Sequence, residues 1–453
     1  MILMWKKIIR ILTLRDVFLG ARFFWLFGGV TALFIASFPF PFLMAIAKAT
    51  LVAAIVLVIV DGFLLFNRGV QISCERVLPR QLSLGDENTV ELKLHNQYGL
   101  NLGITIIDEL PVEFQKRDFE IKDHLEADEA KTYTYQLRPT IRGEYTFFNV
   151  NVFIHSILGL VERRIKNRLE QKILVYPSIM QMNRFSLMAV ARISTMRGVK
   201  KVRRVGTSYE FAQIRNYVKG DDYRSINWKA TSRRNDLMIN QFEDERSQQI
   251  FSVIDKGRSM QMPFNGMSLL DYAINTSLVI SSVALQKHDK AGLMTFSDKI
   301  GATVKAEEGP KQLNLIIETL YKEQPRNYEA NYELLYTATK QFIRRRSLMF
   351  LYTNFESYSA MARVLPLLRH INTAHLLVVV FFENTEIVDY SHQEANTTEE
   401  IYYKTIASKF VEEKHRIVQE LRQYGIQAIL TRPEDLSVHS VNKYLEMKSR
   451  GMI

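Results

Sequence analysis

Two adjacent apolar stretches near the N-terminus constrain this chain more than any other feature. Residues 23–38 contain no charged side chain, and residues 42–66 contain only Lys48 and Asp61. A helix that crosses a bilayer needs about 20 apolar residues, so the second stretch is long enough and the first is at the short end. Two prolines between them interrupt a continuous helix. The sequence therefore predicts an anchor of two membrane-spanning helices.

A cleaved signal peptide and a buried core hairpin are the alternatives to this anchor. A signal peptide has one short apolar core followed by small residues. Here two apolar stretches follow one another, and the second is too long for such a core. Nearly pure apolar runs of this length also argue against a hairpin buried in a soluble core. The sequence favours the membrane anchor over both.

The distribution of lysine and arginine predicts the orientation of the anchor. Basic residues cluster before the first apolar stretch and after the second, and none lies in the connecting turn: Lys6, Lys7, Arg10, Arg15 and Arg22 precede, and Arg68, Arg76 and Arg80 follow. Such residues concentrate on the cytoplasmic side of a membrane. We therefore expect both ends of the anchor in the cytosol, with Lys48 and Asp61 reaching the outer and inner interfaces.

The net charge of +11 calls for an anionic partner or surface. Because basic residues flank the apolar stretches, the sequence favours lipid at the inner membrane over nucleic acid. Residues 1–22 mix apolar and basic side chains and suit an amphipathic segment lying on the inner leaflet. The lone cysteine, Cys74, excludes an internal disulfide and is expected to be a packed strand residue.

From about residue 70 the periodicity becomes that of strands. Val90, Leu92 and Leu94 alternate with polar residues, as in a half-buried strand. The run from Gly143 to His155 is rich in aromatic and β-branched residues and predicts one long strand. Several such runs separated by turn signals predict an antiparallel β-sandwich without a catalytic grouping.

A dense basic run follows the predicted sandwich: Arg192, Arg197, Lys200, Lys201, Arg203 and Arg204. No aromatic platform accompanies it, so a solvated or membrane-facing connector is favoured over a nucleic-acid contact. The domain organisation predicted from these patterns is residues 1–22 amphipathic segment, 23–66 two-helix anchor, 70–178 β-sandwich, 179–205 basic connector, and 206–453 signature region with an α/β domain.

An ordered signature stretch begins the C-terminal part. Its members are Glu210, Phe211, Arg215, Tyr217, Gly220, Asp221, Asp222, Arg224, Trp228 and Lys229. This stretch closely resembles the bacterial domain of unknown function 58 family. The resemblance implies a hydrophobic hairpin, a β-sandwich and a von Willebrand factor A-like domain. It also implies association with an AAA+ ATPase of the MoxR type.

The paired carboxylates of the signature have two interpretations. Asp221 and Asp222 could serve a metal or acid–base chemistry. Adjacent residues usually point in different directions, however, and Arg224 offers an ion-pair partner. The structural interpretation is favoured. Trp228 is expected to be a packing anchor rather than a ligand stacker.

Beyond Gln249, apolar strands alternate with amphipathic helices, which predicts a mostly parallel sheet covered by helices on both faces, in a Rossmann-like α/β domain. Expected strands are 250–254, 292–296, 348–352, 375–382 and 426–430, and expected helices are 269–286, 311–321, 360–370, 399–424 and 434–448. Ligands of such sheets gather at the carboxyl ends of the strands.

The family resemblance places a metal-ion-dependent adhesion site at that edge, with the pattern D-x-S-x-S. Asp255 and Ser259 match it, but Gly257 has no hydroxyl. The later aspartate position reads Asn354, whose amide oxygen carries no charge. Oxygen donors of this kind suit Mg²⁺, yet the degenerate motif and the flanking cations Lys256 and Arg258 disfavour metal binding.

Three functions remain open on the sequence. The leading hypothesis is a non-enzymatic adaptor or scaffold at the inner membrane, working with the AAA+ ATPase. The second is a metal-dependent hydrolase that uses the carboxylates of Asp221, Asp222 or Asp255, although no nucleophile triad, zinc motif or phosphate-binding loop occurs. The third is an exported adhesion-type module, which requires the opposite topology.

Overall fold

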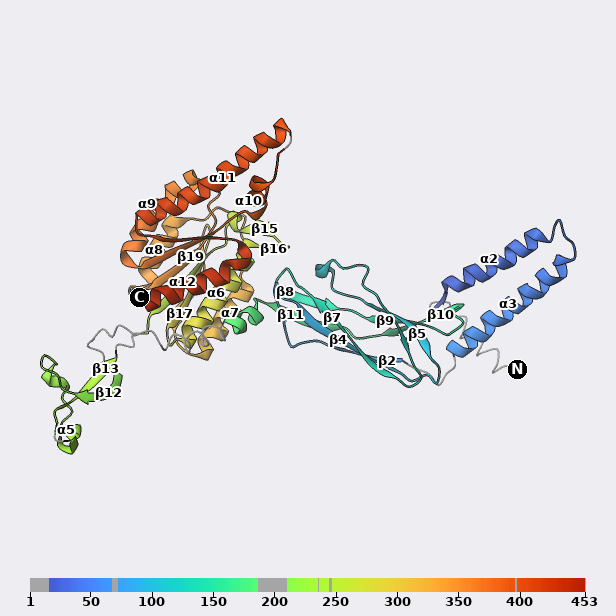
Figure 1. Ribbon diagram of the computed structural model, residues 1–453, viewed down its shortest axis with the longest axis horizontal. Helices are drawn as coiled ribbons and strands as arrows, with labels where there is room; N and C mark the ends of the chain where they lie inside the picture. Colours follow the sequence, from blue (N-terminus) through green and yellow to red (C-terminus); the bar gives the residue numbers. More distant parts are fainter. Residues whose placement is uncertain are drawn as a thin grey trace. The chain divides into compact units, whose positions relative to one another are not determined.

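A computed structural model describes residues 16–66, 72–185, 210–234, 236–243, 247–395 and 397–452. The chain divides into two compact units, Met1–Tyr176 and Pro177–Ile453 (Figure 1). The prediction of a chain with several parts is therefore confirmed at this coarse level. Each unit is described by itself.

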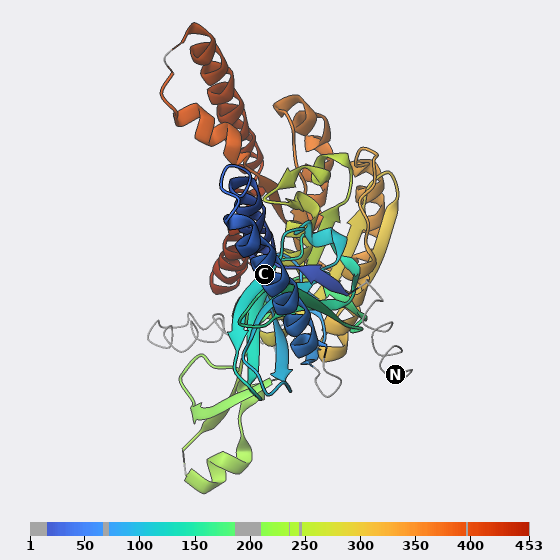
Figure 2. The same cartoon turned by 90° about the vertical axis from the view of Figure 1, so that its right-hand side faces the viewer.

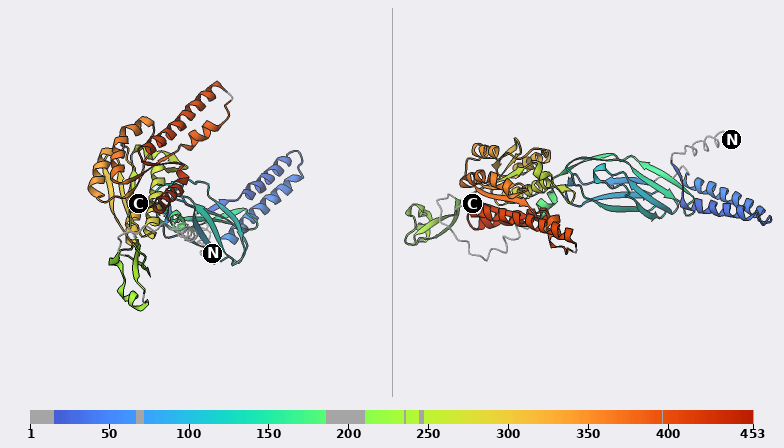
Figure 3. Two further views of the ribbon diagram at one scale, coloured as in Figure 1. Left: turned by 60° about the vertical axis from the view of Figure 1, so that its left-hand side comes forward. Right: turned by 90° about the horizontal axis from the view of Figure 1, so that it is seen from above.

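Two apolar helices begin the first unit: α2 (Ala21–Ala36) and α3 (Leu43–Leu65). They lie side by side (Figures 1 and 3). In the described part of the chain, α3 is the one helix long and apolar enough to cross a membrane, and α2 is a shorter apolar helix. Bulky side chains of both helices are exposed, among them Trp25 at 82% and Val52 at 61%. A helix surface this apolar and uncovered fits lipid better than water.

Asp61 is buried completely, and it joins α3 to the β-rich region that follows. One carboxylate oxygen accepts from the Ser156 hydroxyl, and the other accepts from the backbone N–H groups of Leu160 and Val161, both at 2.9 Å. The expectation that Asp61 reaches toward a lipid interface is therefore wrong. The carboxylate instead accepts hydrogen bonds from residues 156–161 of the β-rich region.

Further contacts fasten the helices to the same region. The Leu65 carbonyl at the end of α3 accepts from Arg163 Nη1 at 2.8 Å and from the Tyr98 hydroxyl at 3.1 Å. In the first turn of α2, Arg22 Nη1 donates to the Ile157 carbonyl at 2.6 Å. The two bonds to Leu65 satisfy a carbonyl that the helix end leaves without an intrahelical partner. The apolar helices are thus attached to the β-rich region at several points.

The strand β1 (Val17–Leu19) corrects part of the predicted amphipathic segment. It pairs antiparallel with β10 (Val161–Asn167), so that Phe18 lies opposite Glu162. Apolar and basic residues suited a helix, but pairing with a sheet edge satisfies the backbone groups here and overrides that pattern. Residues 1–15, which carry most of the predicted segment, lie outside the described residues.

The β-rich region has ten further strands: β2 (Ile72–Val77), β3 (Leu82–Ser83), β4 (Asn88–Asn96), β5 (Leu102–Asp108), β6 (Ile121–Leu125), β7 (Ala130–Leu137), β8 (Gly143–Phe147), β9 (Val150–His155), β10 (Val161–Asn167) and β11 (Gln171–Tyr176). Their sheets have the orders β1-β10-β9-β5-β6, β2-β4-β7 and β3-β11-β8. All pairings are antiparallel except that of β3 with β11. In β4 buried and more exposed residues alternate as predicted.

The run from Gly143 to His155 is two strands rather than one. β8 pairs with β11, whereas β9 pairs with β5 and β10, so the chain changes sheet between Phe147 and Val150. Glu109 holds the crossing by accepting from Asn149 Nδ2 at 2.8 Å. No glycine or proline marks this position, and Asn149 is the one turn-forming residue between the two strands.

Two residues that the charge and cysteine arguments singled out lie in this region. The Arg76 guanidinium is fully buried in an ion pair with Asp108, so it is not a lipid-facing charge as predicted. The Tyr135 hydroxyl also donates to Asp108, at 2.5 Å. Cys74 lies in β2, and burial raises the pKa of its thiol to about 12. A thiol with so high a pKa is a poor nucleophile, in keeping with the packed role expected for it.

Six of the described strands of the second unit form one sheet of order β18-β17-β14-β19-β20-β21. All neighbours are parallel except β17 and β18. The strands are β14 (Gln249–Asp255), β17 (Lys290–Phe296), β18 (Ile300–Glu307), β19 (Leu348–Tyr352), β20 (Leu376–Phe382) and β21 (Gln427–Thr431). The antiparallel strand β18 was not predicted, and the others lie within two residues of their expected bounds.

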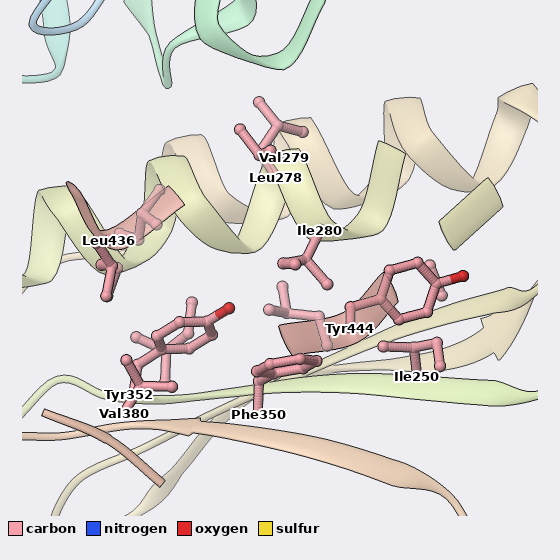
Figure 4. Close-up of a cluster of buried hydrophobic side chains, with 14 of the residues drawn as sticks. Ile250, Leu278, Val279, Ile280, Phe350, Tyr352, Val380, Leu436 and Tyr444 are labelled. Carbon is pink, nitrogen blue, oxygen red and sulfur yellow. The ribbon is translucent and has the colours of Figure 1, made fainter. Parts of the chain in front are cut away.

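Helices cover both faces of this sheet. They are α6 (Leu269–Gln286), α7 (Pro310–Lys322), α8 (Tyr332–Phe342), α9 (Tyr358–Ala374), α10 (Thr385–His392), α11 (Thr398–Gln423) and α12 (Leu436–Ser449). Alternate residues of each strand point to opposite faces. Ile250, Phe350 and Val380 therefore pack with α6 and α12 on one face (Figure 4). Residues between them, such as Val253 and Leu351, pack with α8, α9 and α11 on the other.

Two features of the second unit lie outside its six-stranded sheet and covering helices. The helix α10 and the first turns of α11 run side by side away from the sheet (Figures 1 and 2). The signature stretch forms an antiparallel pair of strands, β12 (Glu210–Asn216) and β13 (Met238–Glu243), joined by a short helix α5 (Trp228–Arg234). Most of the predicted connector lies outside the described residues.

Candidate functional site

The strands β14 and β19 are parallel neighbours, and both end at the same edge of the sheet, with Ile254 opposite Tyr352. Numbered by their order in the chain, the six strands lie in the order 3-2-1-4-5-6 across the sheet. The chain runs from β14 toward one side of the sheet and then continues from β19 toward the other side, so the order reverses at β14. Open α/β sheets bind ligands at such a switch point, beyond the carboxyl ends of the strands. Asp255 ends β14, and Thr353 and Asn354 follow β19. The predicted site residues are therefore brought to one edge.

Asp255 is 1% exposed, and donors of the chain itself satisfy both of its carboxylate oxygens. The Gly257 N–H donates to Oδ1 at 2.7 Å, and the Thr353 hydroxyl donates to Oδ2 at 2.8 Å. The Thr353 hydroxyl in turn lies 2.7 Å from the Tyr332 hydroxyl. Burial raises the pKa of Asp255 to about 6, against the lowering effect of these hydrogen bonds.

Asn354 and Ser259 also meet at this edge. Asn354 Nδ2 donates to the Ser259 backbone carbonyl at 3.2 Å. The ammonium group of Lys414, from α11, donates to the Phe355 carbonyl and lies 3.4 Å from Asn354 Oδ1. Burial lowers the pKa of Lys414 to about 8, so the group is still mostly charged at pH 7. A cation of the chain therefore lies beside the oxygen that sequence reasoning offered to a metal.

These residues do not fit a divalent cation of the adhesion-site type. Gly257 stands where a serine hydroxyl is needed, and a Cβ there would lie 2.9 Å from the Tyr328 carbonyl oxygen and 3.0 Å from Asp255 Oδ1. Contacts that short require the backbone to shift. Asp255 is the single carboxylate of the set, and hydrogen-bond donors already occupy its oxygens.

The flanking cation Lys256 is paired rather than free. Its ammonium group lies 2.6 Å from Glu323 Oε2, and both side chains are largely buried. Glu323 Oε1 also accepts from the Thr295 hydroxyl at 3.0 Å. Sequence reasoning missed Glu323, Tyr332 and Lys414, which are far from Asp255 in the chain. Only the tertiary fold brings them together, so no local pattern could have found them.

The signature stretch uses its carboxylates to shape a turn. Asp221 accepts from Arg215 Nη2 at 2.7 Å and from the Val218 N–H at 2.9 Å, and the Arg215 contact lowers the pKa of its carboxyl. Asp222 accepts from the Arg224 backbone N–H at 3.0 Å. Gly220 has φ of +111°, a value that residues with a Cβ rarely adopt. Each carboxylate thus holds the local backbone.

Two expectations for this stretch are wrong. The ion-pair partner of Asp221 is Arg215, not Arg224, whose guanidinium instead lies 5.8 Å from the centre of the Tyr223 ring. Trp228 is 70% exposed, so within the described residues it is not a packing anchor. Tyr217 and Lys229 lie in the same hairpin. Glu210 and Phe211 are placed in β12 by their backbone, and their side chains lie outside the described part.

Comparison with known proteins bears on this signature. A model of the family described as "Protein of unknown function DUF58" matches residues 213–394. The resemblance read from the signature is confirmed over that range. "Uncharacterized protein YeaD" of Bacillus subtilis (strain 168) is 30% identical over 184 residues, which cover 39% of this chain and 45% of that protein. The match spans less than half the length of this curated relative.

Solved structures give weaker likenesses. The PapD-like domain 7 of human CEP192 has 14% identity and a TM-score of 0.19, over 24% of this chain and 87% of that one. The CARDB domain of the PF1109 protein from Pyrococcus furiosus has 15% identity and a TM-score of 0.18, over 23% of this chain and 93% of that one. TM-scores this low establish no shared fold.

Proposed function

We propose that this chain is a membrane-anchored, non-enzymatic adaptor or scaffold whose soluble parts face the cytosol. Its partner is an AAA+ ATPase of the MoxR type, with which it assembles or remodels other complexes. Its C-terminal unit is a von Willebrand factor A-like domain. Its β-rich region is a sandwich that joins this domain to a two-helix anchor.

The sheet topology supports the A-like assignment. Helices cover both faces, and the strand order reverses beside β14, which ends in Asp255. This is the edge at which the family resemblance predicted the degenerate adhesion motif. The match of residues 213–394 to the DUF58 family supports the same assignment.

The observation that carries the proposal is the closed edge at Asp255. Its carboxylate accepts from Gly257 and Thr353, and Lys414 lies beside Asn354. A catalytic or metal site needs a group left open to substrate or ion. Because the chain's own donors occupy these oxygens, a protein-binding role is a better fit than catalysis.

The helices support the anchoring role. Eighteen residues of α3 precede Asp61, which corresponds to about 27 Å of helix at roughly 1.5 Å per residue. A hydrocarbon core is about 30 Å thick. The buried Asp61 and its partners in the β-rich region then mark where the hydrocarbon ends. In this proposal α2, with 16 residues against the 23 of α3, forms the shorter of the two spans.

The test is direct binding between the purified full chain and a purified AAA+ ATPase of the MoxR type. The chain is reconstituted in lipid nanodiscs, and empty nanodiscs serve as the control. We expect binding with a dissociation constant in the micromolar range or tighter that depends on whether ATP, ADP or no nucleotide is present. Equal signals from loaded and empty nanodiscs in all three states would contradict the proposal.

A separate measurement addresses the hydrolase alternative. Isothermal titration of the full chain with Mg²⁺ or Mn²⁺ should show no site of micromolar affinity. Micromolar binding that is lost in Asp255→Ala would make metal-dependent chemistry the better account.

A further inference from the structure

The second unit carries two exposed features of opposite charge. We call residues 214–240 the basic arm and residues 385–412 the acidic projection. The basic arm is the described hairpin of the signature stretch from Ile214 onward. The acidic projection comprises α10 and the first part of α11, and it ends before Glu413, which accepts from the Tyr358 N–H of α9 at 2.7 Å.

The basic arm combines cations with exposed aromatic rings. It holds six Lys or Arg and three Asp residues. Two of the three carboxylates are engaged in its own turn, Asp221 with Arg215 and Asp222 with a backbone N–H. Tyr223 and Trp228 are 69% and 70% exposed. The exposed cations are Lys219, Arg224, Lys229, Arg233 and Arg234.

The acidic projection has the complementary composition. It holds six Asp or Glu and two Lys residues. Tyr402 and Tyr403 are 64% and 50% exposed, and Ile401 and Phe410 are exposed at 55% and 47%. The exposed carboxylates are Glu386, Asp389, Glu394, Glu399 and Glu412. Its surface thus combines negative charge with exposed apolar and aromatic side chains.

We propose that the basic arm of one copy docks on the acidic projection of a second copy. Opposite charges steer and orient such a contact. Tyr, Trp and Arg are the residues enriched in the centres of protein interfaces, and both surfaces present several of them. Trp228 is the central apolar contact of the arm.

The geometry of this contact has a consequence for assembly. Each copy carries both surfaces, and they differ from one another, so a single contact of one arm with one projection is heterologous. A heterologous interface leaves one surface of each kind open at the ends of a pair, and it builds rings or open chains. A membrane anchor, as proposed above, would confine the copies to one bilayer and favour their encounter.

Charge reversal on each side tests the contact. The arm variant carries Lys229→Glu, Arg233→Glu and Arg234→Glu. The projection variant carries Glu394→Lys, Glu399→Lys and Glu412→Lys. A control variant reverses three exposed lysines elsewhere, Lys299→Glu, Lys305→Glu and Lys311→Glu. Circular dichroism verifies that each full-length variant folds in detergent micelles.

Sedimentation velocity at about 0.1 M salt then measures self-association. We expect the unaltered chain and the control to associate, and each of the other two variants to associate at least tenfold more weakly. An equimolar mixture of the arm and projection variants should regain association, because both reversed surfaces are again complementary. Raising the salt to about 1 M, which shortens the screening length from about 10 Å to about 3 Å, should weaken association of the unaltered chain.

The remaining outcomes overturn the proposal. An unaltered chain that stays monomeric at all concentrations contradicts it, as does equal weakening in the control variant. If both variants lose association but their mixture does not regain it, the two surfaces do not meet between copies. Trp228→Ala tests the apolar centre separately. It should weaken association at every salt concentration, and an unchanged constant would exclude the arm.

Discussion

At the scale of single residues, the buried carboxylate of Asp255 makes the stability of the folded chain depend on pH. Its pKa is about 6 in the folded chain, because burial disfavours the charged form, and 3.8 is the ordinary value. Between pH 4 and 6 the folded state therefore holds a proton that the unfolded state has released. Stability attributable to this residue is greatest at low pH and falls as pH rises through that window.

Replacing the carboxylate by an amide should remove this pH dependence. In Asp255→Asn, the amide oxygen can still accept from Gly257 and the amide nitrogen can donate to Thr353. We expect the difference in opening free energy of the β14 amides, variant minus unaltered chain, to grow by up to about 3 kcal/mol from pH 4 to 7, at about 1.4 kcal/mol per pKa unit. Hydrogen exchange of the full chain in detergent measures it. A difference that does not change with pH would show that folding does not raise the pKa of Asp255.

Gly257 offers a second test at the scale of one residue. Gly257→Ser restores the D-x-S-x-S pattern, but its Cβ meets the Tyr328 carbonyl at 2.9 Å. Crowding of this kind costs typically 1–3 kcal/mol, and we expect faster exchange around β14 with no gain in Mg²⁺ binding by calorimetry. Gly99→Ser, where nothing lies within 4 Å of the added Cβ, is the control. Micromolar Mg²⁺ binding by Gly257→Ser would contradict this account, because it would show that only the absence of the serine hydroxyl prevents metal binding.

At the scale of elements, the attachment of α3 to the β-rich region depends on Asp61. Asp61→Ala would leave the Ser156 hydroxyl and the Leu160 and Val161 N–H groups without their acceptor. An unsatisfied buried donor costs about 1–3 kcal/mol. We expect exchange at Leu160 and Val161 to speed up by at least tenfold. Asp61→Asn, whose oxygen can still face both N–H groups, should retain most of the protection.

The outcome for these two variants separates two accounts of Asp61. If Asp61→Ala leaves exchange at Leu160 and Val161 unchanged, the carboxylate does not fasten the helix to the loop. Asp61 would then face the membrane interface, as its position near the end of an apolar run first indicated.

Elements made of continuous apolar runs could be predicted from the sequence, and those defined by partners could not. The strand Leu348–Tyr352 and the helix Leu269–Gln286 have the predicted bounds, because a buried run is apolar whatever surrounds it. The strand β1 and the break between β8 and β9 were missed. β1 pairs with a strand more than a hundred residues away, and β8 and β9 separate because they pair with different sheets.

The candidate site divides in the same way. The sequence placed Asp255, Ser259 and Asn354 at one edge, because strand ends could be read from apolar runs. It could not supply Lys414 or Tyr332, which reach that edge from α11 and α8. The exposure of Trp228 was also missed, since a tryptophan in a folded chain is usually packed against its own core.

At the scale of the whole molecule, the central claim is that an apolar hairpin holds the β-rich region and the second unit at the cytosolic face of the membrane. The turn between α2 and α3 would then lie on the outer side. Phe38 in that turn is 92% exposed, and Ser232 in the basic arm is also exposed. Both positions can carry a probe without disturbing packing.

The most direct test labels single cysteines, Phe38→Cys or Ser232→Cys, in chains that also carry Cys74→Ser. A membrane-impermeant maleimide is applied to spheroplasts and to permeabilised cells. We expect Phe38→Cys to react in intact spheroplasts and Ser232→Cys to react only after permeabilisation. Labelling of Ser232→Cys in intact spheroplasts would place the second unit outside the cell membrane and contradict the account.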